Sequence, residues 1–147
     1  MEDAKLAMSA ARGRIAIGAA ALAFPGLAAR AMGGRRESEG IGPLFARMLG
    51  GRDVVLGLGT VIALDRGAPV RGWLEGSALA DAVDCVACVV ARDSMPPIVF
   101  VATAGLGAVS AILGIFLSRR LDPPPPPHPG QPEAVATGHP LESVADG

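Results

Sequence analysis

The stretch LGGRDVVLGLG, residues 49–59, decides the fold, because it places two full charges, Arg52 and Asp53, in a run that is otherwise glycine and aliphatic. The rest of the chain has a similar character. Half of its 147 residues are hydrophobic and stand in long blocks, and only 18% are charged. Ordinary soluble domains carry roughly 25% charged residues. The composition therefore predicts a membrane protein, in which charges inside an apolar block need a specific explanation.

Four apolar segments follow one another, separated by short connections rich in glycine, proline and charge. A membrane-crossing helix needs about 20 predominantly apolar residues. The segments predict helices near residues 13–32, 41–64, 72–91 and 97–118. We therefore expect an all-α fold, a four-transmembrane-helix bundle over residues 1–120. The remainder, residues 121–147, is proline-rich and lacks apolar residues for a core, so it predicts a disordered tail.

The first segment has a second interpretation as a signal peptide. Arg12 and Arg14 would form its basic region, and residues 29–31 (Ala-Arg-Ala) would be the small-x-small cleavage site. The arginine inside that site and the apolar segments that follow favour a retained helix instead. Pro25 and Gly26 interrupt this helix, which membrane helices tolerate where neighbours or water satisfy the freed carbonyls.

An even number of crossings puts both chain ends on one side of the membrane. Basic loops stay in the cytoplasm, and the basic residues favour the terminal side by seven to four. On the terminal side stand Lys5, Arg12, Arg14, Arg66, Arg71, Arg119 and Arg120, and opposite them Arg30, Arg35, Arg36 and Arg92. We expect a multi-pass protein of a bacterial inner membrane with both termini in the cytoplasm.

The charges of the second and third segments lie at matched depths. Arg52 stands twelve residues before Leu64, and Asp84 stands twelve residues after Gly72, on the two sides of a short turn. At about 1.5 Å per residue, both lie roughly 18 Å from that turn. A lone charge there costs about 3 kcal/mol or more, so pairing is expected. The predicted intramembrane charge cluster is Arg47, Arg52, Asp53, Asp81 and Asp84.

This cluster has two interpretations. It is either a lock that holds the second and third helices in register, or a proton or ion relay, because intramembrane carboxylates often mark transport pathways. With all five groups ionised its formal charge is −1, so one aspartate could keep a proton. Only the lock predicts that exchanging the charges of Arg52 and Asp84 restores the protein.

Small residues form helix-packing faces on two of the predicted helices. The predicted packing positions are Gly57, Ala104, Gly107, Ala111 and Gly114. Small side chains let membrane helices approach closely. These faces pack either inside the bundle or against a second copy in a homodimer.

The motif Cys85-x-x-Cys88 lies in mid-helix, where residues three apart are too far separated for an unstrained disulfide. Buried, apolar cysteines are the first interpretation, and a redox or metal site the second. The chain shows no catalytic triad, phosphate loop or dinucleotide motif, and we expect neither enzyme activity, cofactor nor bound metal. Its net charge of −1 and lack of a basic stripe argue against nucleic acid as a partner.

Two elements resemble a known group. The stretch RMLGGRDVVLGLG, residues 47–59, has an Arg-x-x-Gly-x-Arg-Asp element followed by a Leu-Gly-Leu run, and ADAVD, residues 80–84, matches an Ala-Asp-Ala-x-Asp element. Between Arg14 and Arg120 the chain resembles uncharacterised, small actinobacterial membrane proteins, loosely similar to the DoxX-like four-helix group. The resemblance implies four helices and a retained first helix. It implies no activity.

Three functions remain open at this point. The first is a non-enzymatic component of the lipid bilayer that acts through a membrane protein partner or a homodimer. The second is a small transporter or proton-coupled accessory that uses the intramembrane Arg/Asp cluster. The third is a membrane redox or metal protein that uses Cys85 and Cys88.

Overall fold

The computed structural model describes residues 1–33 and 40–121. Within these ranges the fold is all-α, as predicted, and contains no strand. The elements are α1 (Glu2–Ala23), α2 (Pro25–Gly33), α4 (Gly42–Asp65), α5 (Arg71–Val90), the 3-10 turn η1 (Arg92–Ser94) and α6 (Pro97–Leu121). The helices predicted near 41–64, 72–91 and 97–118 agree with α4, α5 and α6, with ends that differ by at most three residues. Most of the predicted tail, residues 122–147, lies outside the described residues.

The helix predicted over residues 13–32 is wrong in its start, whereas its interruption at Pro25 and its end agree with the structure, in which α2 ends at Gly33. α1 begins at Glu2, eleven residues earlier, and ends at Ala23. A proline has no N–H to donate and is favoured in the first turn of a helix. Pro25 therefore ends α1 and begins the short helix α2, which packs back on α4.

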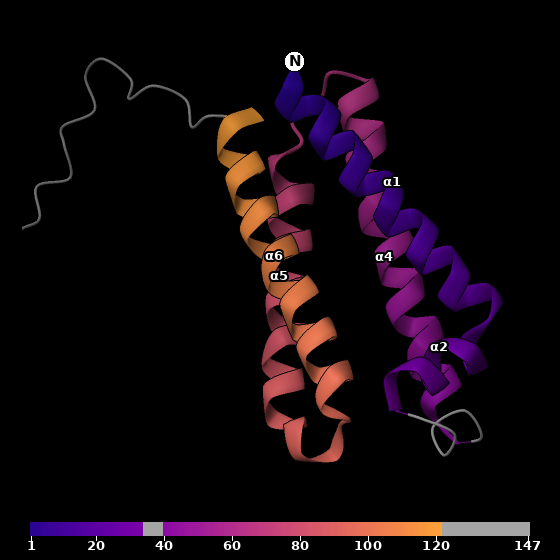
Figure 1. Ribbon diagram of the computed structural model, residues 1–147. Helices are drawn as coiled ribbons and strands as arrows, with labels where there is room; N and C mark the ends of the chain where they lie inside the picture. The colour runs from indigo at the N-terminus through magenta and orange to yellow at the C-terminus, as the bar shows by residue number, and fades with distance from the viewer. Residues whose placement is uncertain (34–39, 122–147) are drawn as a thin grey trace, which may run out of the picture.

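The four long helices are arranged as two close pairs, α1 with α4 and α5 with α6 (Figure 1). In the first pair Gly18 and Gly50 face each other, and a Cβ atom on either would lie 2.6 Å from the carbonyl oxygen of the other. In the second pair a Cβ atom on Gly114 would lie 3.0 Å from that of Ala78. Backbones thus meet almost directly, which only small residues allow.

The connections set the order of the helices. Between α4 and α5 the chain turns at Gly67, whose φ of 60° favours glycine. Pro97 begins α6 after η1. As a result the start of α1 and the end of α6 lie at the same end of the bundle (Figure 1). A small apolar cluster closes that end, formed by Ala7, Ala63, Val70, Leu74 and Leu117.

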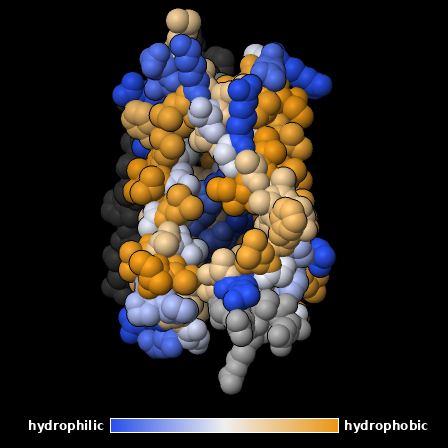
Figure 2. Space-filling view, turned by 45° about the vertical axis from the view of Figure 1, so that its right-hand side comes forward, coloured by the Kyte–Doolittle hydropathy of each residue, from blue (hydrophilic) through white to orange (hydrophobic). Residues whose placement is uncertain are grey.

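The distribution of side chains is the reverse of that in a soluble bundle. The buried apolar residues are mostly alanine, whereas large apolar side chains are exposed on every helix, among them Ile17, Val55, Val86 and Ile112. Figure 2 shows apolar side chains along the flanks and polar ones concentrated at the two ends. By length and composition, α1 and α6 could each cross a membrane.

Candidate functional site

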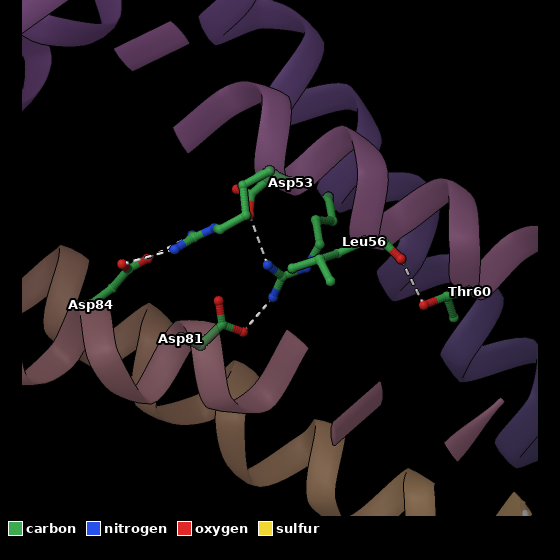
Figure 3. A network of polar contacts seen from close by, with 7 residues as sticks. Asp53, Leu56, Thr60, Asp81 and Asp84 are labelled. Carbon is green, nitrogen blue, oxygen red and sulfur yellow. Dashed lines mark hydrogen bonds and ion pairs between the residues drawn. The ribbon is translucent and has the colours of Figure 1, made fainter. Parts of the chain in front are cut away.

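An ion-pair network joins the two helix pairs near the middle of their length (Figure 3). Arg52 on α4 donates two hydrogen bonds to Asp84 on α5, from Nη1 to Oδ1 at 3.0 Å and from Nη2 to Oδ2 at 2.7 Å. Two parallel bonds are the arrangement in which a planar guanidinium fits a carboxylate most strongly. The structure thus places these two residues in the contact that their matched depths predict.

Arg14 on α1 is the second centre of the network. Its Nη1 donates to Oδ1 of Asp53 on α4 at 2.9 Å, and its Nη2 donates to Oδ2 of Asp81 on α5. One guanidinium therefore ties three helices together. Sequence analysis placed Arg14 at the flank of the first segment and missed this role. Counting from Glu2 would have found it, because Arg14 lies twelve residues along α1, at about 18 Å, like Arg52 and Asp84.

Asp53 links the two halves of the network. Its Oδ1 accepts from Arg14 and also from Nη2 of Arg52 at 3.2 Å. Charges of alternating sign thus run in the order Asp81, Arg14, Asp53, Arg52 and Asp84. With all five ionised, the formal charge is −1. The Asp81 side chain is 9% exposed and that of Asp84 is 34% exposed, so the network has a buried and a more open end.

Arg47 does not join this network. Its side chain is exposed, and it forms no ion pair with another described residue. The reason is helical periodicity: five residues separate Arg47 from Arg52, which turns their side chains about 140° apart around α4. Arg14 takes the place in the charge balance that sequence analysis gave to Arg47.

A cavity of about 290 Å³ adjoins the buried end of the network. All four long helices line it, and Figure 2 shows a hollow at mid-height with a hydrophilic floor on a largely apolar face. Most of the lining is alanine, glycine and leucine. The polar lining residues are Arg14, Asp53, Thr60, Ser77, Asp81 and Ser110.

The small-residue faces pack inside the bundle. A Cβ atom on Gly57 would lie 2.6 Å from Cγ1 of Ile15 on α1, and one on Gly107 would lie 2.8 Å from Sγ of Cys85 on α5. The predicted stripe on α6, Ala104, Gly107, Ala111 and Gly114, is partly or fully buried along its length. α5 contacts this face at Ala104, Gly107 and Gly114, which favours packing inside the bundle. A homodimer stays a prediction.

Cys85 and Cys88 are both free thiols. Sγ of Cys85 donates to the carbonyl oxygen of Ala104 at 3.3 Å, which ties α5 to α6. In the part of the chain that the structure describes, no group of three or more His, Cys, Asp or Glu residues is placed to hold a metal ion. The contacts of Cys85 are those of a packing residue.

Comparisons with protein-family models, curated proteins and solved structures give no match to this chain. They assign no family, and the resemblance to small DoxX-like membrane proteins stays a prediction.

Proposed function

We propose that this chain is an integral membrane protein in which α1, α4, α5 and α6 each cross the bilayer. The observation that carries the proposal is the reversed distribution of side chains, with large apolar residues outside and alanine, glycine and paired charges inside. A soluble protein rarely exposes contiguous apolar surface beyond a few hundred Å². Around this bundle such surface covers every long helix, which suits lipid and not water.

The charges of α4 and α5 fit this proposal because they are paired with one another. Both helices are long enough to cross, but every 18-residue window of either holds at least three charged residues. Four of these charges, Arg52, Asp53, Asp81 and Asp84, belong to the network between the helix pairs. Pairing toward the interior is how membrane helices accommodate ionised residues.

Two arginines lie on the outer surface away from the helix ends, Arg12 on α1 and Arg47 on α4. Side chains in a helix lean toward its N-terminus. Arg12 therefore leans toward one end of the bundle and Arg47 toward the other, since α1 and α4 run in opposite directions (Figure 1). Long basic side chains reach the membrane surface in this way.

Extraction tests the membrane placement directly. The full chain, expressed in bacteria, should stay in the membrane pellet after an alkaline carbonate wash and leave it only with detergent. A matched chain that carries aspartate at the exposed positions Val109 and Ile112 should insert poorly, since each aspartate near a helix centre costs roughly 3 kcal/mol. Release of the unaltered chain by carbonate would rule out the placement.

We propose that both termini face the cytoplasm of a bacterial inner membrane. At the end of the bundle that holds both termini stand Lys5, Arg66, Arg71, Arg119 and Arg120. At the other end stand Arg30 and Arg92, and the connection between α2 and α4 adds Arg35 and Arg36 in the sequence. Arg14 no longer counts, because it belongs to the network. A phosphatase that is active only outside the cytoplasm should be active when fused after Asp93 and inactive when fused at the C-terminus; the reverse pattern would invert the topology.

Within this frame the chain acts as a non-enzymatic membrane component that works through a partner, with the network as a lock between two helical hairpins. The exchange Arg52→Asp with Asp84→Arg tests the lock. Each single change leaves like charges facing each other, so membrane abundance and melting temperature should fall. The exchange should recover most of both. Single variants that keep the abundance and melting temperature of the unaltered chain would show that the network is not a lock.

A second candidate function rests on the cavity. A small transporter or proton-coupled accessory needs polar groups that face an accessible space, and Arg14, Asp53 and Asp81 do so. Flux of protons or small ions into liposomes that contain the purified chain would favour this candidate. Tight liposomes at several protein densities would favour the lock alone.

A further inference from the structure

The wall of the cavity carries an excess of negative charge. Arg14, Asp53 and Asp81 line it, two carboxylates to one guanidinium. The bidentate pair of Arg52 and Asp84 is neutral and does not line the cavity. Nη2 of Arg52 also lies 3.2 Å from Oδ1 of Asp53, so the formal charge of −1 belongs to the network as a whole. A cation bound in the cavity, beside two carboxylates and one guanidinium, would balance it.

Several residues that line this space carry an oxygen without a partner among the described residues. Arg14 engages Oδ2 of Asp81 and Oδ1 of Asp53, and the other oxygen of each carboxylate accepts no hydrogen bond from a described residue. Ser77, only 8% exposed, lines the cavity and forms no hydrogen bond with any residue in the described ranges. The half-buried Ser110 also lines the cavity, and its hydroxyl forms no hydrogen bond with a described residue. Because these oxygens belong to residues that line the cavity and have no partner in the described part of the chain, they are available to contact a bound molecule.

The size and the rest of the lining restrict the class of ligand. A volume of about 290 Å³ holds roughly ten water molecules at about 30 Å³ each, which is more than a bare metal ion needs. Alanine and leucine side chains from α1, α5 and α6 form the apolar part of the wall. The site thus combines a negative, oxygen-rich region with an apolar one.

We propose that this cavity binds a small amphipathic monovalent cation, such as a substituted ammonium, with its charge at Asp81 and Asp53 and its apolar body along the alanine and leucine lining. The inference rests on the proposed membrane placement, in which an unbalanced charge is expensive. A proton on one carboxylate is the alternative way to balance it. The Ser77 hydroxyl fits the cation better, because it supplies a further oxygen next to Asp81, one helical turn away.

The test is calorimetric binding to the purified full chain in detergent micelles. The probes are benzyltrimethylammonium, neutral benzyl alcohol and anionic benzenesulfonate, which share a ring and differ in charge. Binding of the cation should be at least tenfold tighter than that of the other two. Asp81→Asn should weaken it at least tenfold, whereas Glu75→Gln, a carboxylate change on the same helix outside the cavity, should leave it unchanged.

A second variant distinguishes loss of the binding site from loss of folding, since Asp81→Asn also removes an ion pair. Ser110→Leu fills the cavity without touching an ion pair, and at an unchanged melting temperature it should abolish binding of the cation. Equal binding of the neutral and cationic probes would overturn the proposal, as would no binding of any probe by the folded chain. Carbonate extraction reports separately on membrane placement, so a chain that is extracted yet binds the cation would refute that placement and not this site.

Discussion

The interfaces within the helix pairs differ in kind from the interface between them. Inside each pair, glycine lets two backbones meet, as at Gly18 and Gly50. Between the pairs, contact is sparser. It combines ion pairs beside a cavity with the small apolar cluster at one end and the packing of Trp73 on Gly59. In lipid, apolar surface gains little from association, so helices rely on close van der Waals packing or on polar contacts. This bundle uses the first kind of contact inside each pair and adds the second kind between the pairs.

The largest expected effect comes from removing Arg14. Arg14→Gln leaves Asp53 and Asp81 without their shared guanidinium at the most buried end of the network. Removing one partner of a buried ion pair typically costs about 3–5 kcal/mol. We expect a strong fall in membrane abundance and in the melting temperature in detergent.

Arg12→Gln is the matched control for this change. Arg12 stands two residues earlier on the same helix, is exposed, and pairs with no other described residue. Its change should move the melting temperature little. Equal losses in the two variants would mean that α1 needs basic charge in general and that the network does not join the helix pairs.

The next effect tests the glycine contact. Gly50→Ala places a methyl group 2.6 Å from the backbone oxygen of Gly18, and a backbone atom cannot rotate away. Overpacking of this kind costs about 1–3 kcal/mol. Gly51→Ala is its control, because nothing lies within 4 Å of a Cβ atom there, and alanine in place of glycine favours a helix by up to about 1 kcal/mol. The melting temperature should therefore fall for the first variant and hold or rise for the second.

The ion pair between α4 and α5 could be predicted from the sequence, but the part that α1 plays in the network was missed. Depth counting from the turn between α4 and α5 was enough to pair Arg52 with Asp84, because a helix has a fixed rise per residue. The same count was not made for Arg14, which was predicted only to flank the first apolar segment. Charges near the start of α1, such as Glu2 and Lys5, hid where that helix begins, so its register against α4 was unknown.

The cavity and the close contacts depend on helix rotation, which the sequence leaves open. The sequence does not distinguish Gly50 from Gly51, yet a Cβ atom on Gly50 would contact a backbone and one on Gly51 would contact no atom within 4 Å. The small-residue stripe on α6 identified a packing face but not its occupant. Which face of α6 meets α5 follows from the arrangement of the whole bundle, and the hydroxyls of Ser77 and Ser110 share one cavity for the same reason.

A smaller effect is expected at Gly107. A Cβ atom there would lie 2.8 Å from Sγ of Cys85, a side-chain atom that can move more easily than a backbone. Gly107→Ala should lower the melting temperature by less than Gly50→Ala does. Adding Cys85→Ala should recover part of the loss, since it removes the clashing sulfur. A double variant less stable than the sum of its single changes would show that the sulfur is not the obstacle.

The smallest effect is expected at the ion pair of Arg71 and Glu75. This pair has the same kind of arginine–carboxylate contact as the network, but it is exposed. Nε of Arg71 lies 2.7 Å from Oε1 of Glu75, as close as the contacts of the network, but both side chains are 41% exposed at the end of the bundle. Exposed pairs one helical turn apart contribute about 0.3–0.5 kcal/mol. Glu75→Gln should therefore shift the melting temperature by a degree or so, and less at high salt, since screening weakens such pairs. A loss as large as that of Arg14→Gln would mean that burial is not what separates the two kinds of ion pair, and that the interface between the helix pairs owes its strength to something other than its buried charges.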